Sequence, residues 1–127
     1  MRGYVPMAKS ELQALIQSAA ATAKQIFLPT EQLVLEYGIS DLEEAEYGAL
    51  EVAREFAEGA ALSLIIAFEF SDEIIAHGLE VAPGVLEGHF TLKTSDLVAF
   101  YLIADAEEEL EWYDASESEI CLAKALG

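Results

Sequence analysis

Two histidines, His77 and His89, lie on either side of a Pro-Gly pair, and Glu80 and Glu87 are close to them in the sequence. Imidazole and carboxylate groups at such short spacing are ligand types that bind zinc and related metals. A metal site would require His77 and His89 to face each other across a β-hairpin. The register favoured by the apolar residues puts the two rings on opposite faces of the sheet. We therefore expect no metal site and no other cofactor.

His77 falls on the core-facing side of a predicted strand, where an imidazole either belongs to the core or lines a cavity. If a cavity lies between helices and sheet, His77 and Tyr101 are its expected polar groups. No nucleophile stands at a diagnostic spacing from them, and the chain has no phosphate-binding glycine loop, dinucleotide fingerprint, CxxC or HExxH motif. Cys121 is interpreted as structural. The sequence assigns no catalytic residue, and a non-enzymatic protein is favoured.

Acidic side chains dominate the composition: 24 Asp and Glu against 6 Lys and Arg give a formal net charge of −18. The exception is the first thirty residues, where Arg2, Lys9 and Lys24 stand against Glu11 alone. A negative field repels phosphate backbones and anionic lipid surfaces, so we expect neither direct nucleic-acid binding nor membrane binding. Basic proteins would be attracted. The same charge could also serve solubility alone.

Two acidic stretches are candidates for binding a basic partner, one on a predicted helix over 41–58 and one over 105–119. On the helix, Arg54 is the only opposite charge. Like charges at helical spacing destabilise a helix by roughly 0.2 to 0.5 kcal/mol per pair, a cost that a surface selecting Lys- and Arg-rich partners would tolerate. The predicted acidic face consists of Glu44, Glu51, Glu55 and Glu58 on the helix and Glu107, Glu108, Glu109 and Glu111 in the second stretch.

Capping patterns and apolar spacing predict two helices in the first half of the chain. A capping box beginning at Ser10, followed by apolar residues at intervals of three and four, predicts a helix over 10–27. A second capping box, beginning at Ser40, predicts the helix over 41–58. The segment between the two helices fits either a short helix or a strand.

From Ala61 onward the apolar residues alternate with a period of two, which is typical of β-strands. Pro83-Gly84 suits a type II turn that closes a hairpin between Ala82 and Val85, since proline fixes φ and glycine accepts a positive φ. The predicted strands cover 61–70, 75–81, 85–93 and 97–105, with a possible fifth around Leu110 and Trp112 and a possible short helix over 116–126.

These elements predict a single α+β domain over 10–127, preceded by a flexible lead over 1–9. Two N-terminal helices would cover one face of an antiparallel meander of four to five strands. The outer face of that sheet is also apolar, and it needs a second copy, a partner or another helix to cover it. Self-association, at least as a dimer, is expected through Ile65, Ile74, Val98, Phe100 and Leu102.

Three functions fit this description. The first is an acidic protein-interaction module that engages a basic protein, in the manner of a chaperone, an inhibitor or a nucleic-acid mimic. The second is a ligand-binding domain or small enzyme with a pocket around His77, and the third is a structural subunit of a larger assembly. The lone cysteine and the absence of a long apolar run suggest the cytoplasm.

Overall fold

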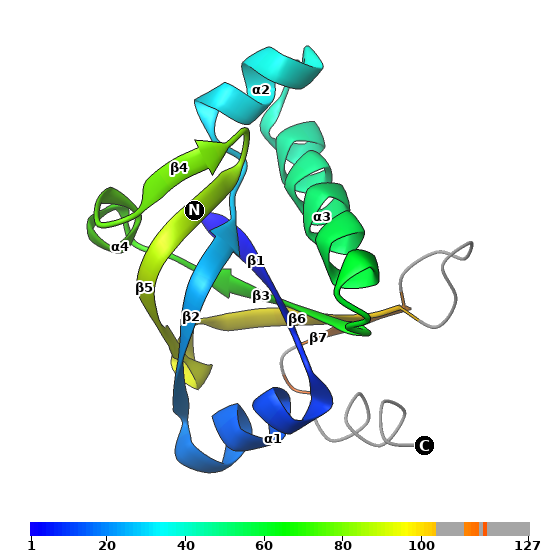
Figure 1. The fold of residues 1–127 in the computed structure, drawn as a ribbon, viewed down its shortest axis with the longest axis vertical. Helices are drawn as coiled ribbons and strands as arrows, with labels where there is room; N and C mark the ends of the chain where they lie inside the picture. Colours follow the sequence, from blue (N-terminus) through cyan, green and yellow to red (C-terminus); the bar gives the residue numbers. More distant parts are fainter. Residues whose placement is uncertain (104–110, 115, 117–127) are drawn as a thin grey trace.

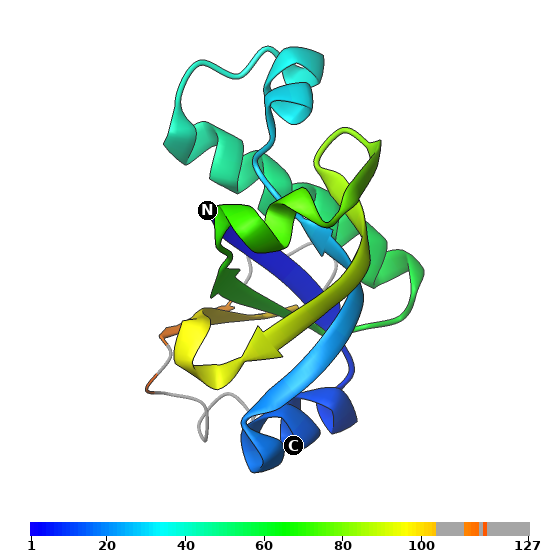
Figure 2. The ribbon, with the colours of Figure 1, turned by 90° about the vertical axis from the view of Figure 1, so that its left-hand side faces the viewer.

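A computed structural model describes residues 1–103, 111–114 and 116. These residues form an α+β fold around one curved antiparallel sheet of seven strands in the order β4-β5-β2-β1-β3-β6-β7 (Figures 1 and 2). The strands are β1 (Arg2–Met7), β2 (Ala20–Phe27), β3 (Leu64–Glu69), β4 (Leu79–Ala82), β5 (Val85–Lys93), β6 (Leu97–Leu102) and β7 (Glu111–Asp114). The helices are α1 (Lys9–Ser18), α2 (Glu31–Tyr37), α3 (Leu42–Gly59) and α4 (Asp72–Ala76), with a 3₁₀ turn at Thr94–Asp96.

The predicted class, α+β with an antiparallel sheet, is confirmed, but the arrangement differs from two helices followed by a meander. Helices alternate with strands through the first two thirds of the chain, and the sheet has seven strands where four to five were predicted. The predicted fifth strand corresponds to β7, which pairs with β6. The possible C-terminal helix over 116–126 lies outside the described residues, except for Ser116.

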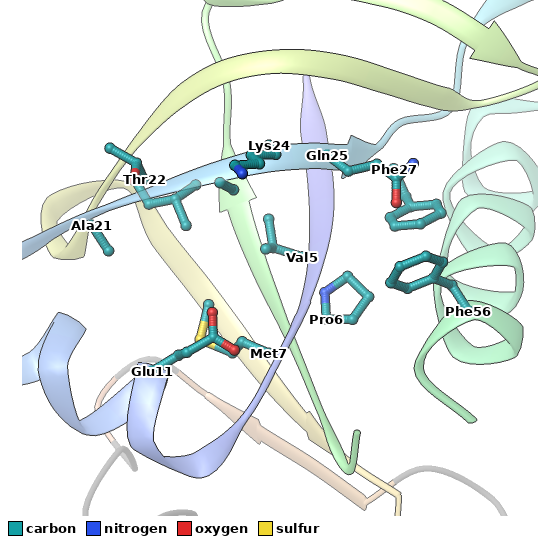
Figure 3. A pocket seen from close by; sticks show the side chains of 12 residues that line it. Val5, Pro6, Met7, Glu11, Ala21, Thr22, Lys24, Gln25, Phe27 and Phe56 are labelled. Carbon is teal, nitrogen blue, oxygen red and sulfur yellow. The ribbon is translucent and has the colours of Figure 1, made fainter. Parts of the chain in front are cut away.

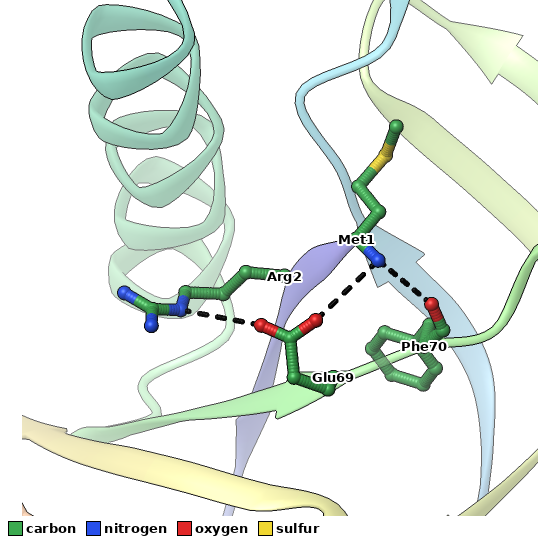
Figure 4. A network of polar contacts seen from close by, with 4 residues as sticks. All are labelled: Met1, Arg2, Glu69 and Phe70. Carbon is green, nitrogen blue, oxygen red and sulfur yellow. Dashed lines mark hydrogen bonds and ion pairs between the residues drawn. The ribbon is translucent and has the colours of Figure 1, made fainter.

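The N-terminal segment, predicted to be a flexible lead, forms the central strand β1. It pairs with β3 along its whole length and with β2 at a single position, Tyr4 opposite Phe27. The amino group of Met1 donates to the Phe70 carbonyl at 2.8 Å, and Glu69 lies 3.4 Å from that amino group (Figure 4). Gly3 permits this close packing, because a Cβ there would meet Phe70 at 2.6 Å. The prediction failed because the segment is a strand only through partners that come much later in the sequence.

The predicted helix over 10–27 is split into α1 and β2. The break is at Ala19, whose left-handed backbone (φ 62°) ends the helix. Beyond it, β2 pairs with β5 from Ala20 opposite Lys93 to Phe27 opposite Val85. The residues of β2 include three alanines that fit a helix or a strand alike, so the long-range pairing decides the outcome.

Helix α3 is the predicted helix over 41–58, displaced by one residue. Its N-cap is Asp41, whose carboxylate accepts the Glu44 N–H at 2.8 Å. Glu44 in turn accepts the Ser40 N–H at 3.2 Å, so the two side chains satisfy exposed amides at the start of the helix. The ambiguous segment before it forms α2, capped by Thr30.

The predicted strand over 75–81 is wrong in its first half, because Ile75 and Ala76 end α4 and the strand begins only at Leu79. The Ser71 hydroxyl accepts the Ile74 N–H at 3.2 Å and caps this helix, so β3 pairs with β1 and β6 where a hairpin to the next segment was predicted. The turn at Pro83-Gly84 is confirmed: Ala82 pairs with Val85 and Gly84 has φ 79°. A bulge then shifts the register, which puts Leu79 opposite Glu87.

Each face of the sheet carries its own hydrophobic core. On one face, α3 covers a cluster that includes Ile65, Ala67 and Ala99. On the other face, large side chains such as Phe68 and Phe100 pack with residues of α1 and α4 and with other strands of the curved sheet. Both faces are therefore covered by this chain itself.

That covering corrects the prediction of an open apolar face for dimerisation. Ile65 is fully buried on the α3 side, where the partly buried Val98 also packs. Phe100 and Leu102 are buried in the core of the opposite face, and Ile74 of α4 is partly buried against it. The five residues therefore do not form one exposed patch. Helix α3 was predicted to cover the opposite face of the sheet, but it covers the face to which Ile65 belongs.

Candidate protein-binding groove

A groove with a volume of about 340 Å³ lies between the end of α2 and the outer side of α3. We call it the acid groove. It is lined by Tyr37, Gly38 and Ile39 at the end of α2 and by Glu44, Tyr47, Gly48, Glu51, Val52 and Glu55 of α3.

The amphipathic pattern of α3 places these side chains. Ala45, Ala49, Ala53 and Ala57 recur every four residues and are buried against the sheet. Glu44, Glu51 and Glu55 are offset from this row and line the groove on the outer side. Gly48 lets the segment after α2 approach, since a Cβ there would already lie 3.2 Å from Ile39. Small residues thus fix both the docking of α3 and the shape of the groove.

The carboxylates of the groove differ in their hydrogen bonding. Glu44 Oε2 lies 3.2 Å from the Ser40 N and 3.1 Å from its hydroxyl. Glu51 and Glu55 form no ion pair with any residue that the structure describes. Two unneutralised carboxylates one helical turn apart are suited to a cationic group from outside the chain.

The structure brings together part of the predicted acidic face. Glu44, Glu51 and Glu55 line the acid groove, whereas Glu58 does not and lies 3.2 Å from Arg54 Nε. Glu111 is placed in β7, where its carboxylate lies 2.8 Å from the Tyr113 hydroxyl. Glu107, Glu108 and Glu109 lie outside the described residues.

Two tyrosines of the groove, Tyr37 and Tyr47, were not predicted as site residues. The side chains of Tyr37 and Tyr47 are 62% and 64% exposed. Tyr47 follows Glu44 by three residues and precedes Glu51 by four, a spacing that puts all three on one side of a helix. That spacing was a usable signal. Exposed aromatic rings are enriched at protein interfaces, and their faces attract Lys and Arg side chains.

The predicted pocket around His77 and Tyr101 does not form. His77 is exposed at the end of α4, whereas Tyr101 of β6 packs edge-on against Tyr4 at a centroid distance of 6.1 Å. Burial raises the pKa of both tyrosines above the ordinary value of 10.0. A tyrosinate nucleophile would need the opposite shift, so this pair remains protonated at neutral pH.

The structure places the two histidines on different elements. His77 follows α4, and His89 is an exposed residue of β5. Within residues 1–103, 111–114 and 116, no three His, Cys, Asp or Glu side chains are grouped as metal ligands. Cys121 lies outside the described residues. No helix in the same part of the chain is both long and apolar enough to cross a bilayer.

Comparisons of the chain with protein-family models, with curated proteins and with solved structures found no match.

Proposed function

We propose that this protein is a non-enzymatic interaction module whose acid groove binds a basic segment of a partner protein. The observation that carries the proposal is the composition of the groove. Its lining includes three carboxylates and two exposed tyrosines but no Lys or Arg. The groove lies on the outer side of a helix that docks through its alanines, so binding requires no rearrangement of the core.

The groove suits Arg better than a general cation. A guanidinium donates parallel hydrogen bonds to carboxylates and can stack on an aromatic ring at the same time. Such a ring contact contributes about 0.5 to 1 kcal/mol at an exposed site. The net charge of −18 would add long-range steering of a basic partner. Solubility alone explains the carboxylates but does not explain exposed aromatic rings between them.

Among the three partner types, the groove favours a chaperone or an inhibitor over a nucleic-acid mimic. Carboxylates on one side of a helix recur about every 5 Å along its axis, whereas the phosphates of one DNA strand recur about every 3.4 Å. Tyr47, which lies between Glu44 and Glu51 on α3, interrupts the row further. A groove that holds individual Arg side chains is the simpler account of these residues.

The test uses a fluorescent peptide of four Arg-Gly repeats, with its dissociation constant measured by anisotropy at low and physiological salt. Charge reversal by Glu51→Lys together with Glu55→Lys should weaken binding by about tenfold or more, because attraction becomes repulsion. The matched control is Glu73→Lys together with Glu87→Lys, which changes two exposed carboxylates outside the groove and gives the same net charge. Equal weakening by both pairs would show a nonspecific charge effect and contradict the proposal.

A second variant tests the aromatic part of the groove without changing the charge. Tyr47→Ala should weaken the peptide about two- to fivefold, the range expected from losing one cation–ring contact. The variant should keep the melting temperature of the parent, because Tyr47 is largely exposed. If the Tyr47→Ala variant bound the peptide with unchanged affinity, the Tyr47 ring would have no part in binding and only the carboxylates of the groove would remain in the proposal.

A further inference from the structure

The sheet contains an opening between its two central strands. Strands β1 and β2 pair only at Tyr4 and Phe27, although each is paired along its length with its other neighbour. Helix α1 joins them at the end away from that pair (Figure 1). The hollow between β1, β2 and α1, with a volume of about 420 Å³, is called the strand opening here.

Two local features keep β1 and β2 apart. Pro6 lies two residues from Tyr4, so its backbone nitrogen points toward β2 as that of Tyr4 does, and proline has no N–H to donate there. In β2, the register against β5 shifts between Ala23 and Gln25. Between these two positions β5 has two residues, Gly88 and His89, opposite the single residue Lys24, so the extra residue of the bulge belongs to β5. A bulge bends the sheet locally, and β2 follows the bend of the strand with which it is paired along its length. The opening is thus associated with Pro6 in β1 and with the bulge of β5 beside Lys24.

The walls of the strand opening are apolar at one end and polar along one side (Figure 3). The rings of Phe27 and Phe56 lie 5.5 Å apart at the apolar end, and Val5 and Met7 contribute from β1. Phe56 is 46% exposed, so one large ring borders the mouth. A volume of this size with mostly apolar walls is typical of small-molecule sites.

Lys24 supplies the charge of the opening. It lies on the rim with Thr22 and Gln25 of β2, and it forms no ion pair with any described residue, in a chain whose acidic residues outnumber basic ones by 24 to 6. Glu11 also lines the opening, but its Oε1 already accepts the Ala8 N–H at 2.9 Å. Glu11 keeps its negative charge, but its carboxylate is held beside α1, whereas Lys24 lies across the opening on β2 (Figure 3). The ammonium of Lys24 is therefore the one positive charge in the lining of this opening.

We propose that the strand opening binds a small amphipathic carboxylate. Its apolar body packs against Phe27, Phe56 and Val5, and its carboxylate meets the ammonium of Lys24. An extended peptide is a poorer fit, because the opening is closed at one end by the Tyr4–Phe27 pair and at the other by α1. The site is independent of the acid groove, which has no basic residue in its lining.

Calorimetry with octanoate and its uncharged analogue octanamide tests the proposal on the full chain. Octanoate should bind with one-to-one stoichiometry, and octanamide should bind about five- to tenfold more weakly for lack of the charged partner. Lys24→Gln should weaken octanoate by a similar factor, whereas Lys93→Gln, the same charge change on an exposed residue outside the opening, should not. Equal affinity of the acid and the amide would overturn the assignment of a carboxylate.

The position of the ligand is tested by amide chemical shifts in a ¹⁵N-labelled sample. Octanoate should shift the signals of Val5, Met7 and Gln25, and Phe56→Ala should reduce both these shifts and the affinity. Shifts confined to α2 and α3 would overturn the site, as would the absence of saturable binding at ligand concentrations up to ~10 mM, the weak end of small-ligand affinities. The absence of saturable octanoate binding would not bear on peptide binding at the acid groove.

Discussion

The two faces of the sheet differ in the size of the side chains that cover them and in the helices that supply these side chains. On the α3 side, small residues make up much of the contact between helix and sheet, with the alanine row of the helix in one cluster with Ala67 and Ala99, although Tyr4 and Phe27 also belong to it. On the other side the core consists of large aliphatic side chains together with rings such as Phe68, Phe90 and Phe100. Small residues let a whole helix lie close to the strands, whereas large rings need a curved sheet and two short helices to enclose them.

Apolar residues on both faces of a strand do not indicate an open surface in this chain. β3 is buried on both faces from Leu64 to Phe68, yet neither face needs a second molecule. The side with small residues leaves the outer surface of α3 free to be acidic. The opposite side has no long helix, and there the contacts among large buried side chains stabilise the fold.

The largest effect is expected from Phe100→Glu. The ring is fully buried in the core opposite α3, so the change removes a large apolar group and buries a charge, at a cost of at least about 3 to 5 kcal/mol. Urea denaturation should find the variant unfolded, or nearly so. Val98→Glu on the α3 side serves as the contrast, because Val98 is only partly buried. A stable, folded Phe100→Glu variant would mean that this face is open.

Alkaline pH should act on the α3 side through Tyr4. Burial, with smaller contributions from Tyr101 and Glu46, raises the pKa of Tyr4 above its ordinary value of 10.0. Above about pH 10 the unfolded chain therefore releases a proton that the native state keeps. Stability contributed by this group is complete below pH 10 and is lost as the pH rises beyond it, by up to about 1.4 kcal/mol per pH unit.

Tyr4→Phe removes that linkage, so the free energy of unfolding should fall less steeply above about pH 10. The measurement is urea denaturation at a series of pH values. Tyr37→Phe is the control, because Tyr37 is largely exposed and should leave the slope unchanged. Identical slopes for Tyr4→Phe and the parent would contradict the proposed burial of this phenol.

The smallest effect concerns the outer surface of α3. Replacing Glu51 and Glu55 by Gln should stabilise the chain by roughly 0.2 to 0.5 kcal/mol, because the two like charges are one turn apart. Glu44→Ala should act in the opposite direction, since it removes the acceptor for the Ser40 N–H. The melting temperatures of both variants, measured in low salt, test this expectation. A lower melting temperature for the double Gln variant would show that Glu51 and Glu55 do not repel each other measurably.

Features that depend on neighbouring residues could be predicted from the sequence. Helix α3 is specified by a capping sequence, a repeating alanine row and an acidic outer side, all within eighteen residues. The Pro83-Gly84 turn is equally local. The same reasoning found Glu44, Glu51 and Glu55, because helical spacing alone places them on one side.

Features that depend on distant pairing could not be predicted. β1 contains Pro6, which argues against a central strand, and its strand character comes from β3. β2 carries alanines without a clear period, and its partner β5 lies more than fifty residues later. The strand opening results from the separation of β1 and β2, and Pro6 contributes to it only because β2 is the neighbour on that side, which the sequence does not reveal.

The central position of β1 has a consequence for how the chain folds. β1 comes before all other strands in the sequence, but β3, with which it pairs along its whole length, begins only at Leu64. β2 likewise pairs along its length with a late strand, β5 at Val85–Lys93. During synthesis the middle of the sheet would therefore remain unpaired until most of the chain has left the ribosome. Contacts of such long sequence separation slow folding, because the intervening loops must close before any pairing energy is gained. Between these events Tyr4, Val5 and Met7 are exposed apolar groups on an unpaired strand, which is the situation in which nascent chains depend on chaperones.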